Sequence, residues 1–501
     1  MKNKVILIFP KTGVDPDIPH VPHSTMFLAE PLLKAGFEPI FIDTRVDSLY
    51  KQKIKHHLPD TICVGITSMT GYQIKHGLAE AKFIRQLNPR VPIIWGGVHP
   101  SALPEQTVKN RYVDIVVRGE GEETFLKLCQ TLKNNQPLNT VPSITFISQE
   151  GIVSTHCQGF VDLNKIKREP WHLIQTQKYI REEMDANRVL TMVTSRGCPF
   201  QCTFCYNHQF NESKWRGRKA EHIIEEIEYL IKRYHINGID FIEDSFFIDI
   251  PRVKKICQGI IDKNIKISIR AACRASEFAR YDDKFINLLK KAGLKFIQCG
   301  IESGSQRILN LIKKGITIEQ VLITAQKLKK HNIEAGFTFM SGFPQETKKD
   351  LYQTLDLIDR VRKINPQVNV SSIFTYTAYP GTELYDVALK YGFQPPQRLE
   401  DWGDYTFFTS SPKLVWLSKK NRRFLQYLSF ITRFAFYSKR VERSFDNPLV
   451  KVAYRILRKD ALTRWKHRYF KFAFEWWFVS HLFRLMANYN FLDRLIKNPK
   501  K

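Results

Sequence analysis

A short stretch with three closely spaced cysteines reads Arg196-Gly197-Cys198-Pro199-Phe200-Gln201-Cys202-Thr203-Phe204-Cys205-Tyr206-Asn207. It follows the apolar run 189–193, which predicts a buried strand. The spacing C-x3-C-x2-C places three thiols on one loop. Three thiolates can hold three irons of a [4Fe–4S] cluster and leave the fourth iron open to bind and reduce a small molecule. The sequence therefore predicts a redox-active iron–sulfur centre with Cys198, Cys202 and Cys205 as its ligands.

Two other roles for these cysteines are less favoured. Structural zinc takes four ligands, usually in two pairs, so His208 would have to complete a Cys3His site. A disulfide framework does not suit 9 cysteines spread over 501 residues without a signal peptide. The remaining cysteines lie mostly in apolar runs and are expected to be small buried side chains: Cys63, Cys129, Cys157, Cys257, Cys273 and Cys299.

The cysteine loop resembles the signature of the radical S-adenosylmethionine (SAM) superfamily, in which an aromatic residue precedes the third cysteine, as Phe204 does here. The resemblance implies that the open iron binds SAM through its amino and carboxylate groups. One electron from the cluster then cleaves SAM to methionine and a 5′-deoxyadenosyl radical. It further implies that Phe204 packs near the adenine, and that a low-potential donor such as flavodoxin or ferredoxin supplies the electron.

Short apolar strands alternate with helical stretches in the N-terminal part of the chain. This alternation predicts a Rossmann-like, doubly wound parallel sheet, which we assign to a domain over 1–140 followed by a connector over 141–185. The strands are expected at 5–9, 38–42, 62–66, 91–95 and 114–117, and the helices at 24–35, 70–86 and 122–132.

Small residues stand at the carboxyl ends of these strands, where such sheets bind ligands. Ser68 follows the third strand, and Gly96 and Gly97 follow the fourth. Together with the radical SAM loop, this arrangement resembles the cobalamin-binding domain of cobalamin-dependent radical enzymes. The resemblance implies that Ser68, Gly96 and Gly97 line the groove for the nucleotide tail of cobalamin. The motif D-x-H-x-x-G, whose histidine ligates cobalt in other cobalamin proteins, is absent, so the lower ligand of cobalt stays undetermined.

A second β/α series over 186–410 predicts most of a parallel barrel. Six strands are expected at 190–194, 238–242, 266–271, 295–301, 334–340 and 368–375. Active sites of β/α barrels collect at the carboxyl ends of the strands. The resemblance implies that Glu243 contacts the methionine amine of SAM, that Arg270 meets its carboxylate and that Glu302 contacts its ribose. Each of these residues alone could equally be a helix cap or a surface charge.

The C-terminal region over 411–501 is basic and rich in aromatic residues. The whole chain has a net charge of +28, and residues 413–501 hold 22 Lys and Arg less 5 Asp and Glu, a net of +17. Helices are expected at 422–430 and through 465–478. We favour helices that pack on the barrel with one basic face, then peripheral membrane contact. Nucleic-acid contact ranks last, because no recognition motif is present.

No membrane-spanning helix is expected, since the most apolar stretch, 476–483, is far shorter than the roughly 20 residues that a bilayer requires. The expected location is the cytoplasm, with peripheral contact at the inner membrane face as an option. The cytoplasm is expected because an oxygen-sensitive cluster and reduced thiols persist in that compartment.

The two resemblances together imply a cobalamin-dependent radical SAM enzyme. The resemblance implies methyl transfer to an unactivated carbon or a phosphinate phosphorus of a small-molecule or lipid-like substrate. A first alternative is oxidative cyclisation, as in the anaerobic magnesium-protoporphyrin monomethyl ester cyclase. A second, of another class, is an iron–sulfur sensor that binds nucleic acid through its basic tail. A methylthiotransferase is disfavoured, because only Cys63 and Cys129 precede residue 150.

Overall fold

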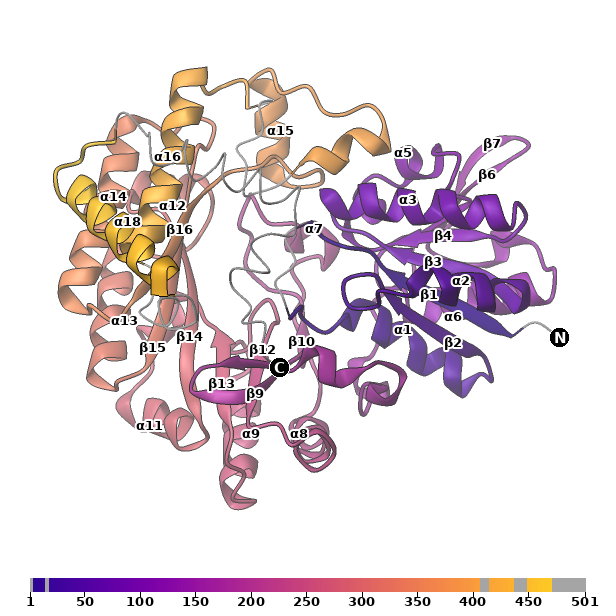
Figure 1. Ribbon diagram of the computed structural model, residues 1–501, viewed down its shortest axis with the longest axis horizontal. Coiled ribbons are helices and arrows are strands. Elements are labelled where there is room, and N and C mark those ends of the chain that lie inside the picture. The colour runs from indigo at the N-terminus through magenta and orange to yellow at the C-terminus, as the bar shows by residue number, and fades with distance from the viewer. Residues whose placement is uncertain (1–2, 14–17, 406–413, 437–447, 471–501) are drawn as a thin grey trace.

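The computed structural model describes residues 3–13, 18–405, 414–436 and 448–470 (Figure 1). The strands of these ranges form two seven-stranded sheets and one two-stranded ribbon. Helices α16 (Lys419–Phe436) and α18 (Pro448–Lys466) follow the second sheet. None of the helices in the described ranges combines the length and the apolarity that a bilayer crossing requires.

The first sheet has the strand order β2-β1-β3-β4-β5-β6-β7. Strands β1 to β5 pair in parallel. Strand β6 pairs antiparallel with β5, and β7 pairs antiparallel with β6. The strands are β1 (Lys4–Phe9), β2 (Glu38–Asp43), β3 (Thr61–Thr67), β4 (Ile93–Gly96), β5 (Ile115–Val117), β6 (Ile144–Ser148) and β7 (Gly151–Ser154). The helices are α1 (His23–Lys34), α2 (Tyr50–His57), α3 (Tyr72–Leu87), α4 (Val98–Ala102), α5 (Pro104–Val108) and α6 (Glu122–Lys133).

Both faces of this sheet are covered by helices. Alternate residues of β1 illustrate the reason, since Leu7 packs in one core with Met26 of α1 and Leu128 of α6. Ile8 packs in a second core with Ile74 of α3. The predicted doubly wound sheet is therefore confirmed, in the order of the flavodoxin type. Strands β6 and β7 extend it into the segment that we expected to be a connector.

The second sheet has the order β16-β15-β14-β13-β12-β9-β8 and curls into a half-barrel (Figure 1). Its strands are β8 (Arg181–Glu183), β9 (Ala186–Met192), β12 (Gly238–Phe241), β13 (Ser268–Ala272), β14 (Leu294–Glu302), β15 (Glu334–Ser341) and β16 (Asn369–Thr375). Six of them run parallel, and β8 pairs antiparallel with β9 at the edge. The predicted partial (β/α)6 barrel is therefore confirmed.

Helices cover the outside of the half-barrel, and a short ribbon of β10 (Ser195–Arg196) and β11 (Arg216–Gly217) lies beside it. The helices are α7 (Asn207–Phe210), α8 (Ala220–Tyr234), α9 (Ile250–Asp262), α10 (Ala275–Phe278), α11 (Asp283–Lys291), α12 (Gln306–Leu311), α13 (Ile318–Lys330), α14 (Lys348–Ile364) and α15 (Glu383–Lys390).

Helix α16 covers the free edge of the half-barrel. The Ser429 hydroxyl lies 2.6 Å from the Ser372 hydroxyl on β16, and Leu428 and Ile431 are buried in the barrel core. The predicted packing of the C-terminal region on the barrel is confirmed for this helix. Helix α18 ends at Lys466, so the predicted helix through 465–478 falls mostly outside the described residues.

The carboxyl ends of the two sheets face each other. Arg196, just before the cysteines, bonds Glu120 at 3.0 Å, beyond the end of β5. The segment after the half-barrel, η6 (Leu399–Asp404), returns to the first sheet, where Trp402 Nε1 donates to Gln106 at 2.7 Å. Ligands bound at the two strand ends would therefore be neighbours.

Candidate active site at the facing strand ends

The cysteine loop follows β9 and is fixed by backbone contacts. Gly197 has φ +83°, and a Cβ there would lie 2.0 Å from the Lys214 carbonyl oxygen. Thr203 links the loop to two other elements, because its N–H donates to Ile312 O at 3.0 Å and its carbonyl accepts from Leu384 N at 2.8 Å. The loop conformation therefore requires glycine at 197.

The three thiols lie in a desolvated setting. Cys202 is buried, and Cys198 and Cys205 are partly buried. Burial raises the pKa of Cys205 to about 12, and burial raises the pKa of Cys198. Thiols in such surroundings ionise when a metal neutralises their charge. This donor set fits an iron–sulfur cluster.

Arg274 is a residue of this site that the sequence did not single out. Its guanidinium donates to Cys202 Sγ at 3.6 Å and lies 3.6 Å from the centre of the Phe200 ring. It also donates to the Lys314 carbonyl. A buried cation beside one of the cysteines favours added negative charge at that point. The sequence feature that could have identified Arg274 is its position just after the strand β13, at a strand end.

The zinc alternative fits the geometry less well. His208 Nδ1 lies 2.6 Å from the Ser213 hydroxyl, which leaves Nε2 as the ring nitrogen that could bind a metal. Within the described ranges, no three His, Cys, Asp or Glu side chains converge closely enough to share one ion. One zinc ion needs such convergence, whereas each thiolate of a cluster binds a different iron.

Glu302 and Phe204 meet through Lys314. The Lys314 ammonium lies 2.8 Å from Glu302 and 5.7 Å from the centre of the Phe204 ring. Glu302 has φ +70°, and a Cβ at Gly300 would lie 2.4 Å from its carboxylate oxygen, so a larger residue at 300 would displace this carboxylate. The structure thus links two of the residues predicted to bind SAM, Glu302 and Phe204 of the cysteine loop, through the Lys314 ammonium.

Glu243, which we expected to contact the methionine amine, and its neighbour Asp244 contact different parts of the protein. Glu243 is buried and accepts from Thr194 at 2.7 Å and from Ser195. Asp244 instead accepts from the Gly197 N–H at 3.1 Å. Burial raises the pKa of both carboxyls, and hydrogen bonds oppose that rise. Asp244 is therefore the carboxylate in direct contact with the cysteine loop.

Arg270 is not brought to the cysteine loop. It lies inside β13, where its register partner on β12 is Asp240, and its guanidinium lies 2.5 Å from Glu183 and 3.6 Å from Asp240. Strand β13 ends at Ala272, so only later residues reach the strand end. Arg274 occupies the position that we expected of Arg270.

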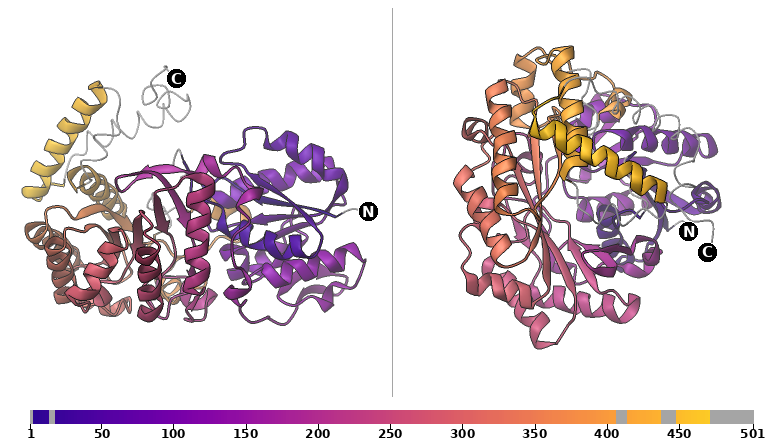
Figure 2. Two further views of the ribbon diagram at one scale, coloured as in Figure 1. Left: turned by 90° about the horizontal axis from the view of Figure 1, so that it is seen from below. Right: turned by 60° about the vertical axis from the view of Figure 1, so that its left-hand side comes forward.

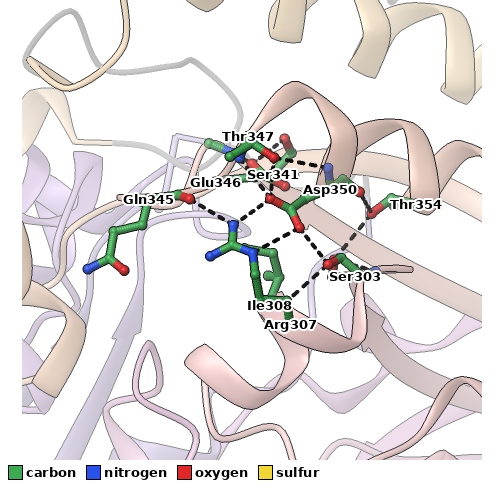
Figure 3. A network of polar contacts seen from close by, with 11 residues as sticks. Ser303, Arg307, Ile308, Ser341, Gln345, Glu346, Thr347, Asp350 and Thr354 are labelled. Carbon is green, nitrogen blue, oxygen red and sulfur yellow. Dashed lines mark hydrogen bonds and ion pairs between the residues drawn. The ribbon is translucent and has the colours of Figure 1, made fainter.

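A buried polar network supports the turn after β15 (Figure 3). The Glu346 carboxylate accepts from the Ser341 hydroxyl at 2.7 Å and from the Gly342 N–H at 2.5 Å. Burial raises the pKa of Glu346 to about 7, and these hydrogen bonds oppose the rise. The turn holds Phe343 with its ring centre 6.4 Å from that of Phe204. The network thus positions one wall of the site.

Asp350 is the second carboxylate of this network (Figure 3). It accepts from Arg307 at 2.5 Å and from the Thr347 hydroxyl at 2.6 Å. Burial raises its pKa, but the hydrogen bonds from Arg307, Ser305 and Thr347 outweigh burial and hold the pKa well below its usual range. The two carboxylates of one turn therefore have opposite pKa shifts.

The predicted cobalamin residues converge at the ends of β3 and β4. Ser68 N donates to Gly96 O at 2.9 Å, and His99 N donates to Ser68 O at 3.2 Å. Gly97 has φ +99°, and a Cβ there would lie 2.7 Å from Ser68 O. Gly96 has ordinary space around it, so the close approach depends on Gly97. The buried Ser68 hydroxyl donates to its neighbouring carbonyl, Met69 O, at 3.0 Å.

His99 stands beside this turn with one ring nitrogen unpartnered. Nδ1 lies 2.9 Å from the Thr70 hydroxyl, whereas Nε2 is buried and has no hydrogen-bond partner among the described residues. Burial lowers the pKa of His99 to about 3. The ring centre lies 5.5 Å from that of Trp402. A polar atom without a partner and a glycine cradle fit a large ligand at this edge.

Comparison with known proteins now bears on both strand ends. The family described as "Radical SAM superfamily" matches residues 192–358, and the family described as "B12 binding domain" matches residues 19–128. An uncharacterized methyltransferase of Pyrococcus horikoshii, PH0819, is 30% identical over 338 residues, which are 67% of this chain and 71% of that protein. The chain belongs to the radical SAM superfamily. It is an enzyme of the branch that joins the radical SAM unit to a B12 binding domain.

Two further similarities extend this result. The anaerobic magnesium-protoporphyrin IX monomethyl ester cyclase of Rubrivivax gelatinosus is 28% identical over 366 residues, 70% of this chain and 64% of that protein. The cobalamin-dependent radical enzyme OxsB has a similar fold, with a TM-score of 0.72, 19% identity, and coverage of 97% of this chain and 75% of that one. The methyltransferase TsrM of Kitasatospora setae has a TM-score of 0.64, 16% identity, and coverage of 78% and 75%.

These matches confirm the predicted family, fold class and cofactor set of a [4Fe–4S] cluster, SAM and cobalamin. Which residue holds which group stays a prediction, as do the domain boundaries at 140, 185 and 410.

Proposed function

We propose that this enzyme methylates an unactivated carbon, or a phosphinate phosphorus, of a small-molecule or lipid-like substrate. The observation that carries the proposal is the apposition of the two strand ends. Arg196 joins the cysteine loop to Glu120 beyond β5, and Arg216 contacts the same carboxylate at 2.8 Å. A substrate between the two ends would reach both the SAM side and the cobalamin side.

In this proposal, Cys198, Cys202 and Cys205 hold the cluster, and Phe204, Glu302 and Asp244 surround SAM. Bound together, the cluster and SAM supply a carbon-centred radical, and cobalamin supplies the methyl group. The side chains of this chain do the positioning. Asp244, in contact with the loop backbone, is placed to neutralise a ligand ammonium.

Ser68, Gly96 and Gly97 form the cobalamin side of the proposed site. The absence of a Cβ at 97 lets a ligand approach the Ser68 backbone closely. Arg270, paired with Glu183 and Asp240 inside the half-barrel, is assigned no contact with SAM. A low-potential flavodoxin or ferredoxin is the proposed electron donor.

Radical oxidative cyclisation is the second candidate. The similarity to the Rubrivivax cyclase covers 70% of this chain, comparable with the 67% for the methyltransferase PH0819. The products separate the two reactions, because methylation adds one carbon to the substrate, whereas oxidative ring closure does not.

The test is anaerobic turnover of the reconstituted enzyme with SAM, a reductant and methylcobalamin, followed by mass spectrometry. 5′-Deoxyadenosine that forms in the wild type but not in Cys202→Ala supports radical initiation at this loop. Incorporation of a labelled methyl group from SAM into a product supports methyl transfer. An intact four-iron spectrum without deoxyadenosine, across a panel of lipid and small-molecule substrates, would contradict the proposal.

A further inference from the structure

Helix α18 lies on the outside of the protein, at the end remote from the N-terminal sheet (Figure 2). Its inner side packs on α16, since Tyr454, Ala461 and Trp465 are buried. The Trp465 ring centre lies 4.7 Å from that of Phe436 on α16, and the Tyr454 ring centre lies 5.8 Å from that of Phe434. The opposite side of α18 therefore faces outward.

Polar contacts with α14 fix the rotation of this helix. Trp465 Nε1 donates to Asp359 at 2.7 Å. Just beyond the helix end, Arg468 donates to Asp359 at 2.6 Å and to Asp356 at 3.0 Å. Because contacts with both α14 and α16 orient α18, the same residues of this helix face outward.

Aliphatic side chains project from that outer side. Val452 is 50% exposed and Ile456 is 63% exposed, whereas Leu462, 39% exposed, lies farther round the helix. Val452 and Ile456 are four residues apart, and Lys459 and Thr463 continue the same helical face. Large aliphatic side chains gathered on one exposed face indicate an interaction surface more often than isolated ones do.

Cations surround these aliphatic residues. Residues 451–470 contain seven Lys and Arg and one acidic residue, Asp460, which pairs with Arg464 within the helix. A surface hollow of about 360 Å³ is lined by Arg455, Arg458, Lys459, Leu462, Thr463 and Lys466. The hollow therefore offers donors and positive charge to an anion.

We propose that the outer face of α18 binds an anionic lipid bilayer surface, with the helix parallel to the membrane and the hollow receiving a lipid phosphate. Cations alone would equally suit nucleic acid, but a phosphodiester backbone offers nothing to Val452 and Ile456. An interfacial helix needs both kinds of residue, since aliphatic side chains enter the acyl boundary while Lys and Arg contact the headgroups. The inference is independent of the proposed reaction.

The test is co-sedimentation of the full-length, cluster-reconstituted protein with vesicles of phosphatidylcholine alone or with added phosphatidylglycerol. We expect binding only with phosphatidylglycerol, and weaker binding at high salt. The triple variant Arg455→Glu, Lys459→Glu, Lys466→Glu should lower the vesicle association constant at least about tenfold, because each cation near an anionic surface contributes favourably. Val452→Ser with Ile456→Ser should lower the binding that persists at high salt.

A matched control replaces three lysines of α11, Lys284, Lys290 and Lys291, with glutamate, which changes the net charge by the same amount. Its vesicle association constant should stay within about twofold of the wild-type value. Circular dichroism and iron content show that each variant is folded. Three results would overturn the inference: equal binding to neutral vesicles, wild-type affinity in the α18 triple variant, or an affinity for an oligonucleotide that α18 substitution removes while vesicles do not bind.

Discussion

The two facing strand ends are built from different material. At the half-barrel, the site consists of side chains, namely three thiols, the Glu302–Lys314 pair and the Arg274 guanidinium. At the first sheet, it consists mainly of backbone, with Gly97 against Ser68 O. A side-chain site depends on chemical groups, and one substitution removes a group. A backbone site depends on space and conformation, so single substitutions should weaken it by degrees.

Cys202→Ala should give the largest effect, because it removes one of the three thiols proposed to ligate iron. We expect loss of the cluster and of deoxyadenosine formation, measured by iron and sulfide content and by electron paramagnetic resonance of the reduced protein. Cys257→Ala, a buried cysteine on α9, is the control and should retain both. Full cluster content in Cys202→Ala would remove the contrast between the two strand ends.

Glu346→Gln tests the buried carboxyl behind the half-barrel site. The folded pKa of Glu346 is raised from 4.5 to about 7, so the folded state holds its proton more tightly than the unfolded state does. The stability from this group is complete below pH 4.5 and is lost as pH rises to about 7. A shift of this size corresponds to about 3 kcal/mol in the free energy of unfolding.

The measurement is urea unfolding of both proteins at several pH values from 5 to 8. We expect the stability of Glu346→Gln relative to wild type to rise across this interval, because the amide does not ionise. Glu319→Gln, at the start of α13 on the surface, serves as the control and should show no such trend. A constant difference between Glu346→Gln and wild type would mean that the carboxyl ionises normally.

The same contrast explains how far the sequence could be interpreted. The cysteine loop and the β/α alternation predict both sheets, because thiol spacing and apolar periodicity are visible in one chain. The sequence singled out Arg270, which lies inside strand β13, whereas Arg274 lies two residues beyond the strand end at Ala272. A contact of Arg270 with SAM stays a prediction. Glu243 and Asp244 are adjacent, and only the fold decides which one faces the loop.

Other features had almost no local signal. Strands β6, β7 and β8 all lie in the segment 141–185 that we expected to be a connector. The edge strands β7 and β8 carry few buried apolar residues, so they give little signal in the sequence. The return of η6 to the first sheet joins residues almost 300 positions apart, as in the contact of Trp402 with Gln106. Such pairing depends on the whole tertiary structure and not on local propensity.

Gly97→Ala tests the backbone site. The substitution places a Cβ 2.7 Å from Ser68 O at φ +99°, so the turn must shift. We expect the dissociation constant for cobalamin to rise about tenfold, from visible absorbance titration of the apoprotein. Gly36→Ala is the matched control, because φ is +78° and a Cβ would meet no atom within 4 Å. Equal loss of affinity in the two variants would attribute the effect to strain alone.

Arg274→Met should give the smallest effect and the one most specific to the side-chain site. The guanidinium donates to Cys202 Sγ at 3.6 Å, and a cation or donor beside a cluster ligand stabilises the reduced state. We expect the reduction potential of the cluster to fall by an amount on the order of tens of millivolts at full iron content. The potential of Arg274→Lys should lie between those of the wild type and Arg274→Met. Lysine keeps the charge but loses the planar donor and its stacking on Phe200. Arg280→Met, whose side chain contacts Ser276 O instead, should leave the potential unchanged. If all three variants share the wild-type potential, Arg274 only supports the loop, and the electrostatic half of the comparison is wrong.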